Sequence, residues 1–259
     1  MKHLTDTHAH TVASTHAYST VEEYFRAASE KGLQLFSITD HGPEMPDSPH
    51  PWHFGNMRVL PRVRYGVAML RGVEANICPS ESRRLDVNEM LMSFMDFGIA
   101  SFHEPVFPPS SRKEHTQAAI HAMETGLIQI LGHPGNPNYP IDIEEVVRAA
   151  RDHNVLIEIN NSSFVSSRLG SEPFCVEILE TVHALDWKVA LSSDSHVHYT
   201  VGDVDIALKK IQRIGFPESQ VVTMNPRRLL EFLAEHGKPV ADELVEWLAE
   251  IDSPAIIEM

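Results

Sequence analysis

The chain lacks the features typical of secreted and membrane-spanning proteins. Its only two cysteines, Cys78 and Cys175, lie far apart and form no C-x-x-C pattern. This spacing does not suggest a disulfide framework or a thiolate metal site, and it predicts a reducing, cytoplasmic compartment. The polar start MKHLTDTHAH contains no apolar signal segment, and no stretch approaches the roughly 18 apolar residues of a membrane helix. We therefore expect neither secretion nor a membrane partner.

Positive charge is also scarce. The 21 Lys and Arg residues stand against 36 Asp and Glu residues, so the formal net charge is −15. Because proteins that bind polyanions usually carry a basic face, this balance argues against nucleic acid as the main partner. It is compatible with a small anion that is drawn to a local positive site.

Histidine, by contrast, is abundant. The chain has 16 histidines among its 259 residues. Hydrophobic residues make up 42% of the chain. A chain of this length and composition can bury a sizeable core without disulfides. Histidine is the commonest metal ligand and is mostly neutral at pH 7, so the positions of these residues decide whether they form a metal site.

Short apolar segments of β type alternate with amphipathic helical segments. The expected strands span residues 3–7, 34–39, 72–77, 96–102, 128–131, 155–159 and 188–191. The expected helices span residues 21–31, 113–125, 142–153, 173–185, 204–214 and 226–236. This alternation predicts βα units around a parallel sheet, and about seven units favour a barrel of the α/β class over an open sheet.

Three segments interrupt this rhythm. Residues 42–55 are rich in proline and predict a long loop at the barrel mouth, and residues 79–86 form a second polar insertion. We expect residues 1–237 to form the barrel and residues 238–259 to add a helical tail. The apolar positions of that tail have helical spacing, which suits a helix packed on the barrel wall or a contact within a homo-oligomer.

The residues that can bind metals fall where the expected strands end. His8 and His10 end the first strand, and their spacing places both imidazoles on one face. The remaining residues of this kind follow or lie in other strands, or occupy the first loop: His16, His41, Glu74, His103, His133, Asp194 and His196. Because barrel active sites are built at the C-terminal ends of strands, all nine side chains should meet at one end.

Each of these residues alone has an ordinary explanation. A His-x-His pair is usually a surface pair, a lone histidine after glycine is usually a loop residue, and Glu74 could be a surface carboxylate. Their joint position at the ends of six strands favours a metal centre instead. Mixed nitrogen and oxygen ligands suit zinc, and they also suit manganese or iron.

Several motifs resemble one known family. The segments DTHAH, TDHG, FHE, GHP and DSH, together with the strand glutamate, resemble the PHP (polymerase and histidinol phosphatase) family. The longer segments GVEANI, GHPGNPNYPID, EINNSSF and NPRRLL resemble its YcdX-type phosphatases. The resemblance covers about residues 1–237, and all nine ligand positions of the family pattern are occupied.

This resemblance implies a distorted (β/α)7 barrel with three divalent ions, usually zinc. It implies three ligand groups: His8, His10, Glu74 and Asp194; then Glu74, His103 and His133; and finally His16, His41 and His196. Only two of these nine ligands are anionic, so three divalent ions would leave the site positive and attractive to phosphate. The expected reaction is hydrolysis of a small phosphate monoester by a metal-bound hydroxide, with Glu74 and Asp194 as the catalytic carboxylates.

Further residues are expected to assist. Arg62, Arg64 and Arg168 are candidate substrate-binding residues, because arginine binds phosphate oxygens in pairs and we expect these three in or beside mouth loops. Surface arginines are also common, so each of them could equally be an ordinary surface residue. Asp6, Asp40, Asn160 and Asn161 are expected to orient the metal ligands.

Three alternatives remain open. A phosphodiesterase or nuclease is the first, although the acidic charge and the absence of a polymerase segment weigh against it. An amidohydrolase that cleaves C–N bonds is the second, but that family usually has a bridging lysine where Glu74 stands, and His16, His41 and His196 have no place in it. A non-catalytic metal-binding module is the third, and ligands on six strand ends beneath loops favour catalysis over it.

Overall fold

Seven parallel strands follow one another in chain order in the computed structural model, which describes residues 2–80 and 82–252. They are β1 (Thr5–Asp6), β2 (Leu35–Ile38), β4 (Val67–Ser80), β6 (Phe97–Ser101), β7 (Ile130–Leu131), β8 (Leu156–Asn160) and β9 (Val189–Ser192). All seven expected strands are confirmed. The short strands β3 (Val63–Arg64) and β5 (Arg83–Leu85), which were not predicted, pair antiparallel with β4. The predicted polar insertion at 79–86 is thus the β4–β5 hairpin.

The barrel is nearly closed between its last and first strands. Near the C-terminal ends, one parallel bridge joins Ala9 to Ser195, and the His10 amide donates to the Ser195 carbonyl at 2.8 Å. Towards the N-terminal ends, the segment around Thr223 lies between β9 and β1. The Thr223 hydroxyl accepts from the Leu191 amide at 2.8 Å, and the Thr223 carbonyl accepts from the Thr5 hydroxyl. The predicted barrel of the α/β class is therefore confirmed, and its distortion lies at this seam.

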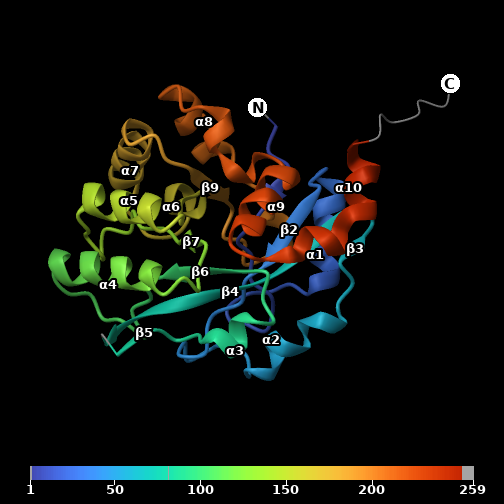
Figure 1. Cartoon of the computed structure of the whole chain (residues 1–259), viewed down its shortest axis with the longest axis horizontal. Helices are drawn as coiled ribbons and strands as arrows, with labels where there is room; N and C mark the ends of the chain where they lie inside the picture. Colours follow the sequence, from blue (N-terminus) through green and yellow to red (C-terminus); the bar gives the residue numbers. More distant parts are fainter. Residues whose placement is uncertain (1, 81, 253–259) are drawn as a thin grey trace.

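The helices surround the strands (Figure 1). The six expected ones are α1 (Val21–Glu30), α4 (Arg112–Glu124), α5 (Ile143–Asp152), α7 (Glu172–Ala184), α8 (Asp205–Arg213) and α9 (Pro226–Glu235). Shorter helical segments are α2 (Trp52–Asn56), η1 (Met57–Val59), α3 (Glu89–Met92), α6 (Ser162–Val165), η2 (His198–Thr200), η3 (Glu218–Gln220), η4 (Val222–Met224), η5 (Pro239–Leu244) and α10 (Val245–Asp252). Helix α1 begins where Thr20 and Glu23 form a reciprocal capping box. None of the described helices has both the length and the apolar character required to cross a membrane.

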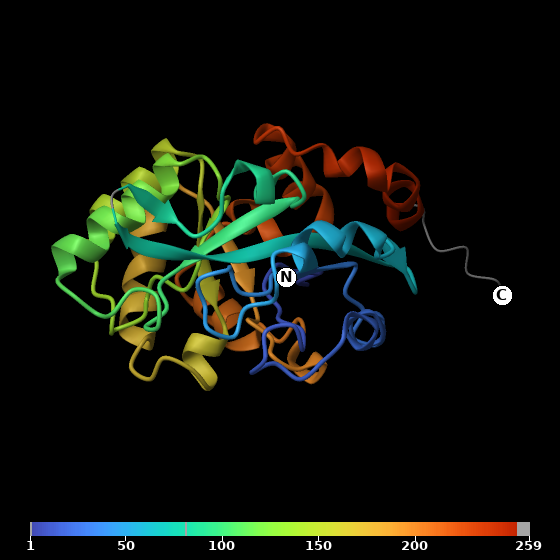
Figure 2. The ribbon, with the colours of Figure 1, turned by 90° about the horizontal axis from the view of Figure 1, so that it is seen from below.

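The N-terminal end of the barrel is filled by apolar side chains. Alternate strand residues such as Leu70, Ile99 and Leu156 join Leu230 of α9 and Trp247 of α10 in one buried cluster. The Trp247 indole also donates to the Gly66 carbonyl at 2.9 Å. Figure 2 shows the red C-terminal helices on one side of β4 and the blue loop after β1 on the other. The described part of the tail therefore packs on its own chain and covers this end.

Candidate metal centre

One buried carboxylate collects the histidines at the C-terminal end of the barrel. Glu74 lies on β4 with the same alternation as Leu70, so its side chain points into the barrel. Its two oxygens lie within 3.4 Å of ring nitrogens from five histidines: His8, His10, His41, His103 and His133. Five imidazoles around one carboxylate give Glu74 the geometry of a bridging ligand.

The other predicted ligands meet the same cluster. His8 Nε2 and His10 Nε2 lie 3.6 and 3.5 Å from Asp194 Oδ1, and His196 Nε2 lies 2.9 Å from His16 Nε2. Three sets have ligand atoms within 4.8 Å of one another: His8, His10 and Asp194; His10, His41 and His196; and His41, Glu74 and His103. The structure thus brings all nine predicted residues together.

Outer partners decide which ring nitrogen of four predicted histidine ligands faces the cluster. His8 Nδ1 donates to Glu158 at 2.7 Å, and His103 Nδ1 donates to Asn76 Oδ1 at 2.6 Å. His196 Nδ1 donates to a backbone carbonyl at 3.1 Å, and His16 Nδ1 contacts the Asp47 carboxylate. In the neutral tautomers that these partners select, the Nε2 atoms offer lone pairs toward the cluster.

The positions of these lone pairs show whether the residues suit a metal. The Nε2 atoms of His16 and His196 face each other at 2.9 Å, and His103 Nε2 faces Glu74 Oε1 at 3.3 Å. Two acceptors at such distances repel each other unless a proton or a metal cation lies between them. In addition, His10 Nδ1 and His41 Nε2 are buried without a hydrogen-bond partner among the described residues. The donor set therefore fits divalent cations.

The electrostatics agree with this fit. Burial, together with the neighbouring His41, lowers the pKa of His10 to about 3, so this imidazole is neutral and free to bind a metal. Burial alone would raise the pKa of Glu74 and Asp194, but His8 and its neighbours hold both values well below the usual range. The carboxylates around His8 and His41 hold the pKa of both rings above the usual value despite burial, so a bound cation would have to displace protons from these two rings. His10 and the two carboxylates already have the protonation states that metal binding requires.

Glu158 was not predicted, yet it holds two histidines in place. It is buried on β8, where one oxygen accepts from His8 Nδ1 at 2.7 Å and from Ser192 Oγ at 2.5 Å. The other oxygen accepts from the His133 backbone amide at 2.7 Å. The available signal was a charged residue inside the apolar strand VLIEIN, which is rare unless the charge has buried partners.

Four other residues were expected to orient the ligands. Asn160 donates to Asp194 Oδ2 at 3.2 Å, whereas Asn161 Oδ1 accepts from the backbone amides of Ile206 and Ala207 at the start of α8. Asp40 accepts from Thr11, Ser14 and His53, and so ties together the loops after β1 and β2. Asp6 accepts from the Ser193 amide at 3.1 Å and joins β1 to β9. Asn160 therefore contacts the side chain of Asp194 and Asp6 accepts from the His8 backbone amide at 3.4 Å, whereas Asp40 and Asn161 hold neighbouring segments in place.

Three residues of the centre have left-handed backbone. The φ angles are +30° at His133, +52° at Arg168 and +56° at Asp194. A non-glycine residue in this region is uncommon, and such conformations persist where surrounding contacts hold them. Here the contacts are present, because Arg168 Nη2 donates to Asp194 Oδ2 at 2.6 Å. The conformation places an arginine beside the predicted ligands.

Two of the three predicted substrate-binding arginines do not lie at the mouth. Arg62 pairs with Asp96, which precedes β6, whereas His103 follows the other end of that strand. Arg64 lies on β3 opposite Val67, the first residue of β4, and pairs with Glu22. The prediction was wrong for both, because the chain after residue 51 descends along the barrel wall before β3. Arg168 alone lies at the centre.

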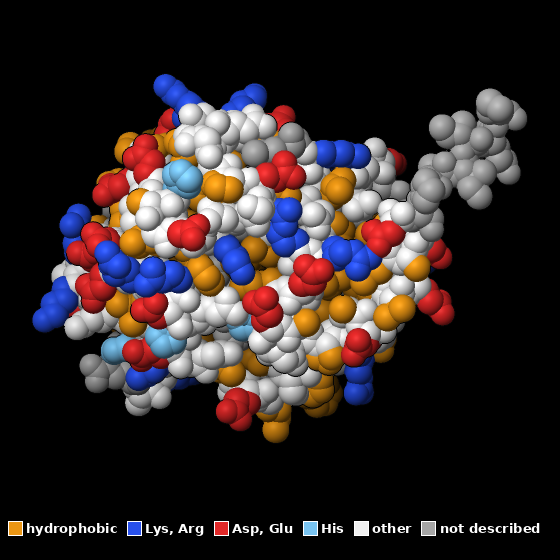
Figure 3. Space-filling model, turned by 45° about the horizontal axis from the view of Figure 1, so that its top comes forward, with side chains coloured by type: hydrophobic (Ala, Val, Ile, Leu, Met, Phe, Trp, Pro, Cys, Tyr) orange, Lys and Arg blue, Asp and Glu red, His pale blue; other side chains and the backbone are white. Residues whose placement is uncertain are grey.

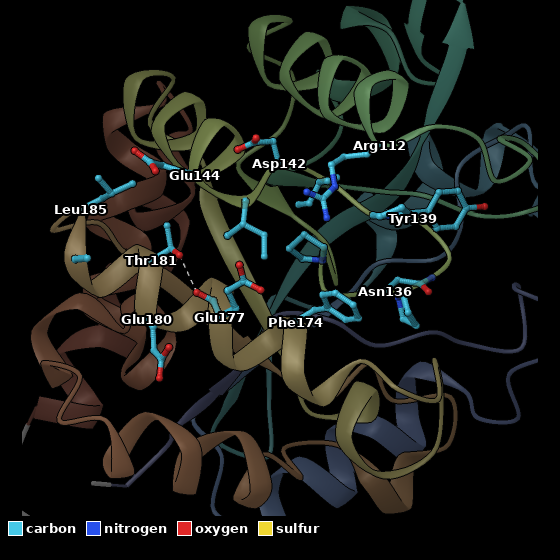
Figure 4. A pocket seen from close by; sticks show the side chains of 16 residues that line it. Arg112, Asn136, Tyr139, Asp142, Glu144, Phe174, Glu177, Glu180, Thr181 and Leu185 are labelled. Atoms are coloured by element: carbon cyan, nitrogen blue, oxygen red, sulfur yellow. Dashed lines mark hydrogen bonds between the residues drawn. The ribbon is translucent and has the colours of Figure 1, made fainter.

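A separate cavity lies outside the barrel mouth. It has a volume of about 600 Å³ and is lined by α5, α7 and the loop after β7. Figure 4 shows Arg112 and Glu177 directed into it, with Asp142, Phe174 and Tyr139 around them. None of the nine predicted ligands lines this cavity, so it is not part of the metal centre.

The surface agrees with the charge balance. On the face that Figure 3 shows, Lys and Arg side chains alternate with Asp and Glu side chains. That face offers no continuous basic surface of the kind that binds nucleic acid.

Comparison with known proteins identifies close relatives. The family model for the PHP domain matches residues 6–162. A protein of Shewanella piezotolerans named "probable phosphatase" is 51% identical over 246 residues, which cover 95% of this chain and 99% of that protein. Another so named, from Enterobacter sp. strain 638, is 48% identical over 93% of this chain and 98% of its own length.

One solved structure shares the fold at low identity. It is the histidinol phosphate phosphatase of Lactococcus lactis subsp. lactis, complexed with zinc, L-histidinol and phosphate. It aligns with a TM-score of 0.61 at 17% identity, over 84% of this chain and 95% of that one.

Proposed function

The chain belongs to the PHP domain family and is a metal-dependent phosphatase, and we propose that it hydrolyses a small phosphate monoester at a centre of three divalent ions. The position of Glu74 carries this proposal. Its two oxygens are each shared by at least two imidazoles, and the remaining three predicted ligands, His16, His196 and Asp194, adjoin that group. Nine ligands are more than one or two ions need.

The proposed ligand groups follow the resemblance. His8, His10, Glu74 and Asp194 would hold one ion, and Glu74 would bridge to a second on His103 and His133. His16, His41 and His196 would hold the third. The 2.9 Å approach of His16 to His196 supports the third group. Zinc is the proposed metal because the ligands are mainly imidazoles, and because the Lactococcus relative holds zinc.

The protein contributes orientation and exclusion of water. Bound divalent ions lower the pKa of a coordinated water toward about 7 and stabilise charge on phosphoryl oxygens. Glu158 and Asn76 fix the rings of His8 and His103, so that their lone pairs point at the centre. Glu74, Asp194 and the His8 ring are buried, which shields the charges from bulk water, whereas the His103 ring is partly exposed.

Arg168 is the proposed phosphate-binding residue. Its Nε and Nη2 atoms donate to Ser163, Asn160 and Asp194, which fix the guanidinium in place. Its Nη1 atom donates to no described residue, so it can donate to a phosphoryl oxygen. A fixed guanidinium with a free N–H suits an oxyanion that arrives from solvent.

The amidohydrolase alternative is disfavoured by the same geometry. A glutamate occupies the place where that family usually has a lysine, and the group of His16, His41 and His196 has no role in such a site. A nuclease is disfavoured because the net charge is −15.

The test compares metal-free and metal-loaded protein. Chelated protein should not hydrolyse 4-nitrophenyl phosphate, and zinc, manganese or iron should restore turnover. Bis(4-nitrophenyl) phosphate, a diester, should be a much poorer substrate. Faster cleavage of the diester would instead favour the phosphodiesterase, and inactivity on both esters with full metal content would favour the non-catalytic module.

A further inference from the structure

Three neighbouring loops surround one side of the metal centre. They are residues 11–20 after β1, residues 161–171 after β8 and residues 195–202 after β9. Strands β8 and β9 pair directly, and Ala9 bridges to Ser195, so the three loops adjoin one another. The Tyr18 amide also donates to the His196 carbonyl at 2.8 Å, which joins the first loop to the third.

These loops expose large hydrophobic side chains. Tyr18 is 75% exposed and Leu169 is 99% exposed, and Val12 and Val165 are also more than half exposed. Tyr199 is exposed as well, but its carbonyl accepts from Lys31 at the C-terminal end of α1, so it lies on the barrel wall. We call Val12, Tyr18, Val165 and Leu169 the apolar rim. Single exposed hydrophobic residues are ordinary, but a group of them around a binding site indicates a contact surface.

The same loops carry almost no charge. Among residues 11–20, 161–171 and 195–202, the only Asp, Glu, Lys or Arg is Arg168, although 22% of the whole chain is charged. A substrate with a second phosphate or a carboxylate would therefore meet no further cation here. The loop after β2, in contrast, contains Glu44 and Asp47.

The apolar rim adjoins the proposed phosphate site by direct chain connection. Leu169 follows Arg168, whose guanidinium lies 2.6 Å from Asp194. Tyr18 follows His16 by two residues. A phosphate held by Arg168 and the predicted ligands would therefore bring its alcohol portion close to the loops that carry these side chains.

We propose that the apolar rim binds the alcohol portion of the substrate and selects phosphate monoesters of uncharged, apolar alcohols. This inference rests on the proposed phosphatase function and adds the substrate class. Contact with the substrate removes apolar surface from water on both sides, which favours binding in proportion to the area buried. The rim thus determines specificity, whereas the metal centre performs the reaction.

Linear alkyl phosphates from methyl to octyl test this proposal. From ethyl phosphate upward their leaving groups have nearly equal basicity, so a change in kcat/KM along the series reports contact with the chain. We expect kcat/KM to rise with each methylene, by at most about fourfold for a fully buried one. Tyr18→Ser and Leu169→Ser should reduce this slope. Met90→Ser is the matched control, because Met90 is also 75% exposed but lies on α3, and it should leave the slope unchanged.

The outcomes separate this proposal from the function on which it rests. Activity on all esters with no dependence on chain length would overturn the rim and leave the phosphatase standing. A slope that both rim variants retain, or that Met90→Ser also reduces, would likewise overturn the rim. Failure to hydrolyse any ester, with full metal content, would instead overturn the proposed phosphatase function.

Discussion

The two ends of the barrel are built from the same strands but have opposite interiors. On β4, Leu70 lies in the apolar cluster that Trp247 and α9 cover, and Glu74 lies four residues further among five histidines. On β8, Leu156 and Glu158 repeat this contrast within two residues. A parallel barrel therefore separates the part that stabilises the fold from the part that binds and reacts.

This comparison makes the two ends separately testable. Apolar burial at the N-terminal end contributes stability, and changes there should not alter the metal centre. Charges and lone pairs at the C-terminal end are expensive to bury without metals, so changes there should alter metal binding and activity more than folding.

Glu74→Gln should give the largest effect on activity. The substitution keeps the size of the side chain but removes the charge that screens two neighbouring cations, and an amide binds cations more weakly. We expect one ion to bind far more weakly and turnover to fall by orders of magnitude, while the unfolding temperature of the metal-free protein changes little. Elemental analysis and turnover on one preparation check this. Full metal content with near-normal turnover would show that Glu74 is no bridge.

Leu230→Ala should give the largest effect on stability. Leu230 is buried in the apolar cluster at the opposite end, and removing its methyl groups leaves a cavity. We expect the free energy of unfolding to fall by about 2–5 kcal/mol, with metal content and kcat unchanged below the unfolding temperature. Denaturant titration and kinetics measure the two quantities. A loss of metal in the folded variant would mean that the two ends are coupled.

Glu158→Gln should weaken metal binding without removing a ligand. Its carboxylate fixes the tautomer of His8 and supports the backbone at His133. Loss of such an outer partner typically costs about 10–100-fold in metal affinity or activity. Zinc affinity by competition with a chelator measures the effect, and NMR of the His8 ring reports its tautomer. If the variant keeps its zinc affinity and its His8 tautomer, Glu158 does not position the metal ligands.

Arg168→Ala should give the smallest effect of the four. If its guanidinium binds the phosphate equally strongly in the ground state and in the transition state, its loss should raise KM about tenfold with little change in kcat. Metal content should stay constant. Arg62→Ala is the contrast, because Arg62 pairs with Asp96 at the other end and should change stability rather than KM. Unaltered kinetics for Arg168→Ala would remove it from the binding site.

Much of this arrangement could be predicted from local sequence patterns. The His-x-His pair, the strand glutamate and the D-S-H segment lie at strand ends, and the C-terminal ends of parallel strands necessarily meet. The seven strands and six main helices followed from hydrophobic periodicity in the same way.

The unpredicted parts depend on contacts between distant segments. Arg62 and Arg64 were placed at the mouth because nothing local shows that the chain descends the barrel wall and returns as the β3–β4 hairpin. Thr223 packs between β1 and β9, where its carbonyl accepts from the Thr5 hydroxyl, although the two residues lie more than 200 positions apart in the sequence. Glu158 was overlooked because its role depends on His8, which lies 150 positions away.

Zinc titration of chelated protein tests the central account most directly, with bound metal and 4-nitrophenyl phosphate turnover followed together. We predict that binding saturates at three ions per chain, that turnover appears as the centre fills, and that His16→Ala binds one ion fewer while remaining folded. Full turnover in metal-free protein, or saturation at a single ion in both proteins, would contradict the account.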